Sequence, residues 1–455
     1  MAPSRPRRIV LRRALPIVAL LVLVPTASAM LGPELSARFG PAGPASAAPS
    51  VAAGSAASPA AGASPRAAPS ASASPRPSGP VGVQAPRVVH DPARAAVRLA
   101  LKVRLDGIQA KYGIPGVSVT IIFPDGSQWF GAAGLADVGA GVPVTRDTAF
   151  AVASISKTFT SALVLALVED GSVRLEAPAA TYLPDLGLDS AVTVRHLLDH
   201  TSGLRDYFFH RDIDRLLLAH PDRRWTASEA LQYVGKPYFK PGRGWHYSNT
   251  NYLLLGLLAE RVGGAPLADQ LRARFFGPLG LDGTFYQPTD EPTRPVAHGY
   301  RFGTGADARP LDLTGDGSIA PFASVVTAAA GAGGIAATSS DIARWARALY
   351  GGGVLAPATL RMMLDDAART ERFRPTVPYG LGVQSVDVAG ESTLGHSGRL
   401  LGSRAVVRYL PDSGFTVAVL TNQSRTDPAI IARALLRIAM APARDCPCLD
   451  VGRGR

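Results

Sequence analysis

Ser154 and Lys157 lie three residues apart, ahead of an apolar run over residues 162–168 that gives way to Gly171. The run has helical length, and glycine commonly ends a helix. If the helix begins near Ser154, residues three apart share a face, so the amine of Lys157 lies beside the hydroxyl of Ser154. A serine needs a base to become a nucleophile, and a buried lysine with a lowered pKa can be that base. A serine in this position is more often an ordinary helix cap, so the pair alone does not establish a site.

Two further polar groups follow along the chain. Tyr247-Ser-Asn249 comes directly before a helical pattern over residues 251–262. A phenol beside an amide can relay a proton and hold a substrate carbonyl, although Ser248 or Asn249 would also serve as a helix cap. His396-Ser-Gly398 leads into the β-rich end of the chain. The small Gly398 would let a substrate backbone lie against a strand, and a turn is the alternative.

These three motifs, in this order, resemble the serine penicillin-recognising hydrolase family. The similarity is to the branch of class C β-lactamases and D-alanyl-D-alanine carboxypeptidases, which has Tyr-x-Asn in place of Ser-x-Asn. Its peptidases and esterases often have His-x-Gly where lactamases have Lys-Thr-Gly. The resemblance covers roughly residues 95–441. Further matching stretches are Asp147-Thr-Ala-Phe150, Leu197-Leu-Asp-His-Thr-Ser-Gly-Leu204, Phe276-Gly-Pro-Leu-Gly-Leu281, Ala332-Gly-Gly-Ile335 and Tyr379-Gly-Leu-Gly382.

The resemblance implies a catalytic role for three residues. Ser154 would attack a carbonyl and form an acyl-enzyme, while Lys157 and Tyr247 would transfer the protons. It implies no cofactor and no metal. The residues that would bind substrate are Asn249, His396, Ser397, Gly398 and Arg399.

Each substrate-binding residue has an expected task. Asn249 would contact the substrate amide, and the backbone N–H groups of Ser154 and Arg399 would form the oxyanion hole. His396 and Ser397 would hold a substrate carboxylate or order the site. The family commonly has Gly, a small residue and Pro-Gly-Tyr after His-x-Gly, but this chain has Arg399-Leu-Leu-Gly-Ser403. The arginine side chain would narrow the cleft or bind an anion.

The expected activity is that of an exported serine hydrolase, most of all a D-alanyl-D-alanine carboxypeptidase acting on peptidoglycan-type peptides. The alternatives are an esterase, a D-amino-acid peptidase or amidase, a β-lactamase, or a slow-turnover penicillin-binding protein. The absence of Lys-Thr-Gly disfavours fast β-lactam hydrolysis. A neutral histidine attracts a carboxylate less than a lysine does, which leaves neutral esters open. The partner is therefore a small peptide or β-lactam-like substrate, with cell-envelope peptidoglycan as its source.

The expected fold is α+β, an antiparallel sheet flanked by helices with an inserted all-helical lobe over about 172–320. Strand-like runs stand at both ends of the domain, the first as a hairpin over 116–133 and the last over 380–388, 404–410 and 415–421. Helical patterns cover 94–112 and 427–440. Thr226 and Glu229 form a capping box, and Ser339 or Ser340 is expected to cap a helix that ends at Tyr350. The resemblance places the site in the cleft between the two lobes.

The first 29 residues are typical of an export signal. Five arginines precede an apolar core over residues 14–24, and Ala27-Ser-Ala29 fits a cleavage site. An uncleaved anchor is the alternative, but the core is short for a membrane span, so no stable span is expected after cleavage. A linker rich in Ala, Pro and Ser follows over 30–88, then the hydrolase domain over 89–442 and a tail over 443–455. A secreted, cell-envelope location follows from this order.

Composition limits the remaining function classes. The net charge of the 455 residues is +12, and without Lys-rich runs or interleaved aromatic residues it does not indicate nucleic-acid binding. Cys446 and Cys448 lie too close together for an unstrained disulfide bond, and their role stays open. His196 and His200 have the spacing of a metal-binding pair on a helix, but the glutamate that zinc proteases place beside the first histidine is missing.

Overall fold

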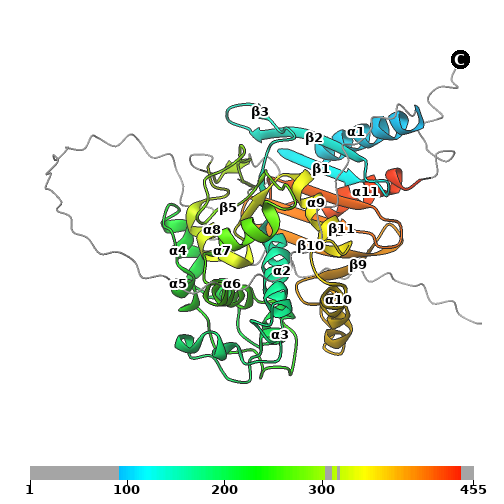
Figure 1. The fold of residues 1–455 in the computed structure, drawn as a ribbon. Coiled ribbons are helices and arrows are strands. Elements are labelled where there is room, and N and C mark those ends of the chain that lie inside the picture. Colours follow the sequence, from blue (N-terminus) through cyan, green and yellow to red (C-terminus); the bar gives the residue numbers. More distant parts are fainter. Residues whose placement is uncertain (1–91, 303–309, 315–317, 442–455) are drawn as a thin grey trace, which may run out of the picture.

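The computed structural model describes residues 92–302, 310–314 and 318–441 (Figure 1). The predicted signal over 1–29, the linker over 30–88 and the tail over 443–455 lie outside the described residues. Within the described part, no helix has the length and apolar character needed to cross a membrane.

A seven-stranded antiparallel sheet brings the two ends of the domain together. The first strand pairs with the last along its whole length, and Val119 lies opposite Val419. This arrangement confirms the expected α+β fold with strands from both chain ends. In spatial order the strands are β3 (Val142–Pro143), β2 (Gln128–Asp137), β1 (Gly116–Ile122), β12 (Thr416–Thr421), β11 (Ser403–Tyr409), β10 (Glu391–Leu400) and β9 (Gln384–Val388).

Helices cover both faces of this sheet (Figure 1). On one face, α1 (Pro92–Tyr112) and α11 (Ala429–Ala439) pack against each other and against the strands. Alternate residues of β12 enter different cores: Val417 and Val419 join the cluster under α1 and α11, whereas Ala418 and Leu420 join the cluster on the other face. The alternation of strand side chains therefore builds two apolar layers from one buried strand.

The second face is covered by α2 (Ser156–Glu169) and α9 (Ser339–Tyr350), with α10 (Pro357–Glu371) at its edge. The α2 helix is buried from Ser156 to Leu167, as expected for a helix between two layers. The ring of Phe159 stacks on Trp345 of α9, with ring centroids 4.0 Å apart and planes at 9°. This contact ties the helix that follows Ser154 to the sheet-covering helix.

The inserted segment consists of helices joined by long loops, and its longest helix, α6 (Asn249–Gly263), packs directly on α2. It also carries short strands: β5 (Thr284–Tyr286) joins a small sheet with β4 (Phe150–Ala151) and β8 (Ile335–Ala337), and β6 (Tyr300–Arg301) pairs with β7 (Leu311–Asp312). Its helices, together with the α8 helix that follows it, are α3 (Val194–Leu198), α4 (Ile213–Ala219), α5 (Ala227–Leu231), α6 (Asn249–Gly263), α7 (Leu267–Leu271) and α8 (Ala323–Ala329).

Local predictions from the sequence are mostly confirmed, with two corrections. The capping box of α5 is present, because the Thr226 hydroxyl accepts the backbone N–H of Glu229 and the Glu229 carboxylate accepts the backbone N–H of Thr226. The cap of α9 was assigned to the wrong hydroxyl: Thr338, not Ser339 or Ser340, accepts the N–H of Asp341 at 3.2 Å. The expected strand over 380–388 begins only at Gln384, because the preceding residues form a tight turn.

The corrected cap makes a testable prediction. Thr338→Ala removes the acceptor for an otherwise free helix N–H and should lower the free energy of unfolding by about 1 kcal/mol. Ser340→Ala, two residues along the same helix, should change it by less than half as much. Urea denaturation of the two variants checks this, and an equal loss in both would contradict the assignment of the cap.

Candidate active site

Ser154 is held in a 3₁₀ turn, Ala153–Ile155, that leads directly into α2. Ala153 has a φ of +51°, a conformation that costs energy for a residue with a side chain. The turn is fixed on its far side, because Val152 donates its N–H to Ile335 O at 3.0 Å. Such backbone strain persists only where the surrounding structure holds it. Here the strained turn places Ser154 directly before the first turn of a buried helix.

Lys157 is fully buried and completes the predicted pair. Its Nζ donates to Ser154 Oγ at 3.1 Å, to Asn249 Oδ1 at 2.7 Å and to the backbone oxygen of Ala332 at 2.7 Å. Burial lowers the pKa of Lys157 to about 7, against the opposing attraction of the Asp206 carboxylate. A large fraction of the amine is therefore neutral near pH 7, and a neutral amine at this distance can take the proton of the Ser154 hydroxyl.

Tyr247 lies just before α6 begins, and its side chain forms a hydrogen bond with Ser154. Burial raises the pKa of Tyr247 well above its ordinary value, and a hydrogen bond to Ser154 only partly offsets this effect. The Lys157 Nζ lies 5.0 Å from the centroid of the phenol ring. Burial therefore lowers the pKa of Lys157 and raises the pKa of Tyr247. As a result Lys157 can be the base, and Tyr247 keeps its proton and can be the proton donor.

Asn249 has its side chain engaged within the protein on both sides. Its Oδ1 accepts from Lys157, and its Nδ2 donates to Asp206 Oδ2 at 2.7 Å. These two bonds leave the second hydrogen of Nδ2 unused, so the expected contact with a substrate amide stays a prediction. Asn249 also holds the amine of Lys157 in place and connects it to a buried carboxylate.

Asp206 is the functional residue that the sequence interpretation missed. It is 1% exposed and accepts the backbone N–H of Asn249 at 3.1 Å and that of Phe208 at 3.0 Å. Its charge is the nearby negative charge that favours the protonated form of Lys157. The one available signal was an acidic residue placed directly before the aromatic run Tyr207-Phe-Phe209.

His200 supports the segment that carries Tyr247. The ring Nδ1 accepts the backbone N–H of Ser248 at 3.2 Å and lies 3.1 Å from Asn251 Nδ2, while the backbone oxygen of His200 accepts the N–H of His246. His196 uses its own Nδ1 to cap α3, by accepting the N–H of Thr193 at 3.3 Å. The two histidines thus make separate hydrogen bonds within the protein, which favours a structural role for each of them over a metal-binding pair.

His396 lies inside β10 rather than in a turn, and it does not present a cation to the cleft. It is 1% exposed, and burial lowers its pKa to about 3. Its Nδ1 lies 2.6 Å from the oxygen of Ser397, and its Nε2 lies 3.0 Å from the hydroxyl of Tyr379. Of the two roles expected for His396, ordering the site agrees with this arrangement, and electrostatic attraction of a carboxylate does not.

Gly398 is required by the protein's own backbone. A Cβ at this position would lie 2.1 Å from the oxygen of Val152, so glycine lets β10 approach the turn that carries Ser154. The expected approach of a substrate backbone to Gly398 stays a prediction. Ser397 donates both its N–H and its hydroxyl to Gln384 Oε1. Arg399 follows on the same strand, and beyond Gly395 this strand pairs only with β11. The strand segment from His396 to Leu400 is therefore not paired with β9, and β10 lies beside the serine turn.

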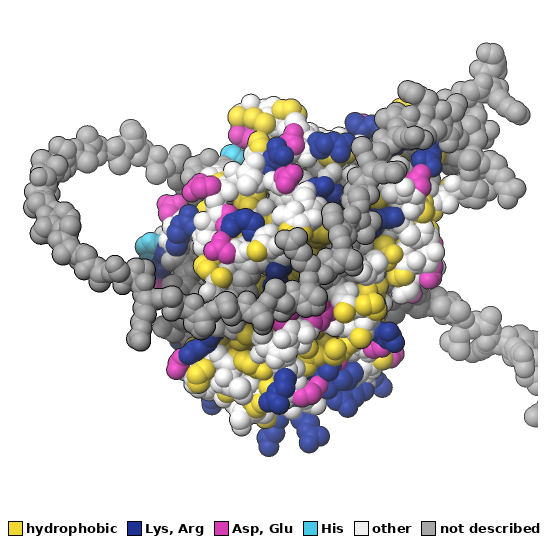
Figure 2. Space-filling model, viewed as in Figure 1, with side chains coloured by type: hydrophobic (Ala, Val, Ile, Leu, Met, Phe, Trp, Pro, Cys, Tyr) yellow, Lys and Arg dark blue, Asp and Glu magenta, His cyan; other side chains and the backbone are white. Residues whose placement is uncertain are grey.

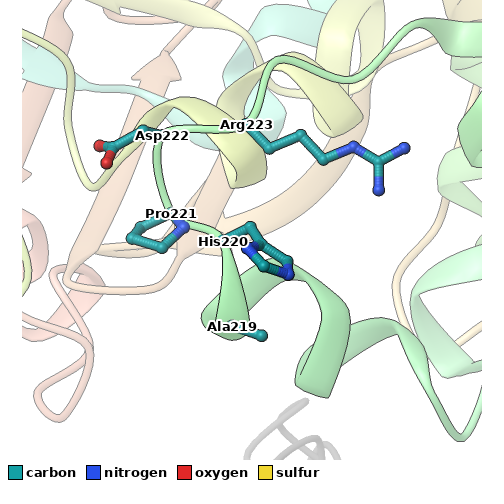
Figure 3. A pocket seen from close by; sticks show the side chains of 5 residues that line it. All are labelled: Ala219, His220, Pro221, Asp222 and Arg223. Carbon is teal, nitrogen blue, oxygen red and sulfur yellow. The ribbon is translucent and has the colours of Figure 1, made fainter.

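The structure brings together Ser154, Lys157, Tyr247 and Asn249, with His396 behind Tyr247 at a ring-centroid distance of 6.3 Å. A separate hollow of about 510 Å³ lies at the end of α4 (Figure 3). It is lined by Ala219, His220, Pro221, Asp222 and Arg223, and Asp222 and Arg223 point to opposite sides of it. Its lining has no serine beside an amine, so the catalytic geometry belongs to the Ser154 site.

The pKa of Lys157 predicts the pH dependence of acylation. Because only the neutral amine can accept the Ser154 proton, kcat/KM for a nitrophenyl ester should rise about tenfold per pH unit below about pH 7 and level off above it. Asp206→Asn removes the charge that favours the protonated amine, so the acid limb should move to lower pH.

Asp214→Asn is the control, since it removes a different carboxylate of the same lobe, one that is partly buried. This variant should leave the acid limb of the pH profile where it is. Steady-state rates between pH 5 and 9 measure all three proteins. An unshifted limb in Asp206→Asn would mean that Asp206 acts through packing alone.

Comparisons with known proteins agree with this geometry. The family model described as Beta-lactamase matches residues 101–440. Penicillin-binding protein 4 of Amycolatopsis lactamdurans is 31% identical over 335 residues, which cover 70% of this chain and 84% of that protein. Esterase EstB of Burkholderia gladioli is 37% identical over 163 residues, covering 33% of this chain and 41% of the esterase.

Among solved structures, D-amino acid amidase from Ochrobactrum anthropi SV3 superposes with a TM-score of 0.65 at 26% identity, over 76% of this chain and 99% of the amidase. The amidase, the esterase and the penicillin-binding protein have names that indicate different activities, and each is similar to this chain. With a family match over three quarters of the chain and an assembled Ser-Lys-Tyr centre, the protein belongs to the β-lactamase family of serine hydrolases.

Proposed function

We propose that this protein is a serine hydrolase that forms an acyl-enzyme at Ser154 with D-alanyl peptides and releases the C-terminal residue, as a D-alanyl-D-alanine carboxypeptidase does. The observation that carries the proposal is the fully buried Lys157, whose amine lies 3.1 Å from Ser154 Oγ with a pKa near 7. Tyr247, which keeps its proton, completes an acid–base pair around one nucleophile.

The reaction follows from these positions. Ser154 Oγ attacks the scissile carbonyl and passes its proton to the neutral amine of Lys157. Tyr247 gives a proton to the departing nitrogen as the carbon–nitrogen bond breaks, and the Lys157 ammonium restores the phenol. Water then attacks the ester and reverses the proton transfers, which returns Ser154 to its hydroxyl form. The backbone N–H groups of Ser154 and Arg399 are the proposed donors to the oxyanion.

The peptide substrate is supported by the relatives. Amycolatopsis lactamdurans has a similar chain named a penicillin-binding protein, and the aligned region covers most of both proteins. The sequence pattern of an export signal over 1–29, followed by a linker, favours a substrate outside the cell membrane. Peptidoglycan-type peptides meet both conditions.

A second candidate is the hydrolysis of D-amino-acid amides or neutral esters on the same centre. It is favoured by His396, which is neutral and has both ring nitrogens engaged, so this position supplies no positive charge for a C-terminal carboxylate. The similar amidase and esterase folds agree with such substrates. The two candidates differ in the leaving group and share the acylation step.

Tyr247→Phe tests the proton donor. Removing the phenol hydroxyl should lower kcat by about 10²–10⁴-fold on an amide substrate, as expected for the loss of a general acid–base group. A nitrophenyl ester has a good leaving group and should lose less. Equal effects on both substrates would assign Tyr247 to substrate positioning instead.

Product analysis tests the substrate class. Wild type and Ser154→Ala are each incubated with a D-alanyl-D-alanine peptide, D-alanine amide and a short-chain nitrophenyl ester. Release of D-alanine by wild type alone supports the carboxypeptidase. Turnover of the amide or ester without release of D-alanine from the peptide would replace it with the second candidate, and undiminished hydrolysis in Ser154→Ala would remove Ser154 as nucleophile.

A further inference from the structure

A positively charged loop borders the catalytic centre. The rim loop, Gly235–His246, is twelve residues long, contains three cations and contains no acidic residue. Arg205 lies against this loop from a neighbouring segment, with its guanidinium 5.3 Å from the ring centroid of Tyr238. The exposed cations are Arg205, Lys236, Lys240 and Arg243.

The rim loop is fixed next to the residues that do chemistry. Tyr238 donates its N–H to Gly203 O at 2.8 Å, and Gly242 donates to Thr201 O at 2.9 Å. The ring of Tyr238 stacks on His246 at 3.9 Å, one residue before Tyr247. The loop therefore rests on the same segment that ends in Asp206, and it ends one residue before Tyr247.

These charges lack local compensation. Among the described residues, none of the four cations of the rim forms an ion pair, whereas the neighbouring arginines do: Arg369 pairs with Asp199 and Arg195 with Asp366. Two carboxylates of this region, Asp199 and Asp366, are thus already paired with other arginines. Figure 2 shows Lys and Arg side chains gathered at the lower end of the molecule, the end at which Figure 1 places α3 and the loops around it.

We infer that the rim loop selects substrates whose acyl portion is an acidic peptide, so that carboxylates near the scissile D-residue contact Lys236, Lys240 and Arg243. This inference rests on the proposed function and specifies its substrate class. Surface cations of one sign beside a site raise the local concentration of an anionic substrate and its association rate. The contribution is screened by salt over about 10 Å at 0.1 M ionic strength.

Two matched esters test the inference. Both are nitrophenyl esters of D-alanine, one with a triglutamate peptide on the amino group and one with a triglutamine peptide. At low ionic strength the wild type should have a kcat/KM about tenfold higher for the acidic ester, at the lower end of the range for electrostatic steering. The ratio should fall towards one as salt is added.

Charge variants locate the effect. In the combined variant Lys236→Glu, Lys240→Glu and Arg243→Glu, the ratio of the two kcat/KM values should fall to one or below. The neutral version with Gln at all three positions should lie between this variant and wild type. A control with the same change of charge on α1, Arg98→Glu, Arg104→Glu and Lys111→Glu, should keep the wild-type ratio.

The outcomes separate this inference from the proposed function. A wild-type ratio near one, or an unchanged ratio in the loop variant, overturns the inference while the hydrolase remains. If neither ester is hydrolysed, the proposed function fails, and fluorescence anisotropy with a labelled triglutamate–D-alanine peptide tests the surface alone. Binding that the loop variant loses supports the rim loop as an acidic-peptide site, and absence of binding to wild type overturns it.

Discussion

The burial of one amine governs the chemistry of this protein. Lys157 is enclosed by α2, by the start of α6 and by the loop before β8. Its three hydrogen bonds go to Ser154, to Asn249 at the start of α6 and to Ala332 before β8. Removing an ammonium from water disfavours its charged form, and that cost is what makes Lys157 a usable base near neutral pH. A lysine at the same spacing on an exposed helix would stay protonated and leave Ser154 inert.

The rest of the fold maintains this enclosure. Strands from both chain ends form one sheet, and β10 can lie against the serine turn because Gly398 leaves room for the backbone of Val152. Asp206 opposes the effect of burial on Lys157. It accepts a hydrogen bond from Asn249, and its negative charge favours the charged amine that burial disfavours. The site thus depends on two opposing electrostatic effects, and the segment that ends in Asp206 also carries the rim loop and its excess of positive charge.

Local geometry explains what the sequence could predict. The contact between Ser154 and Lys157 follows from helical spacing, and the capping box of Thr226 follows from a four-residue pattern. The cap of α9 was ambiguous because three hydroxyl residues stand in a row, and only the backbone decides that Thr338 is the acceptor. Asp206 is 43 residues from its partner Asn249, so no local pattern reveals the pairing.

The role of His396 was also beyond local reasoning. Its position was predicted by motif, but its state depends on Tyr379 and on burial under the sheet edge. The approach of the serine turn to Gly398 was not predicted, because it becomes visible only in the folded chain.

A direct titration of Lys157 tests the central claim. The chain has only five lysines, at positions 102, 111, 157, 236 and 240, so ¹³C-labelled lysine gives few signals, and Lys157→Arg assigns the one of interest. We predict that the Lys157 signal titrates near pH 7. A Lys157 signal that titrates near the ordinary value of 10.5 would contradict the assignment of this residue as the base.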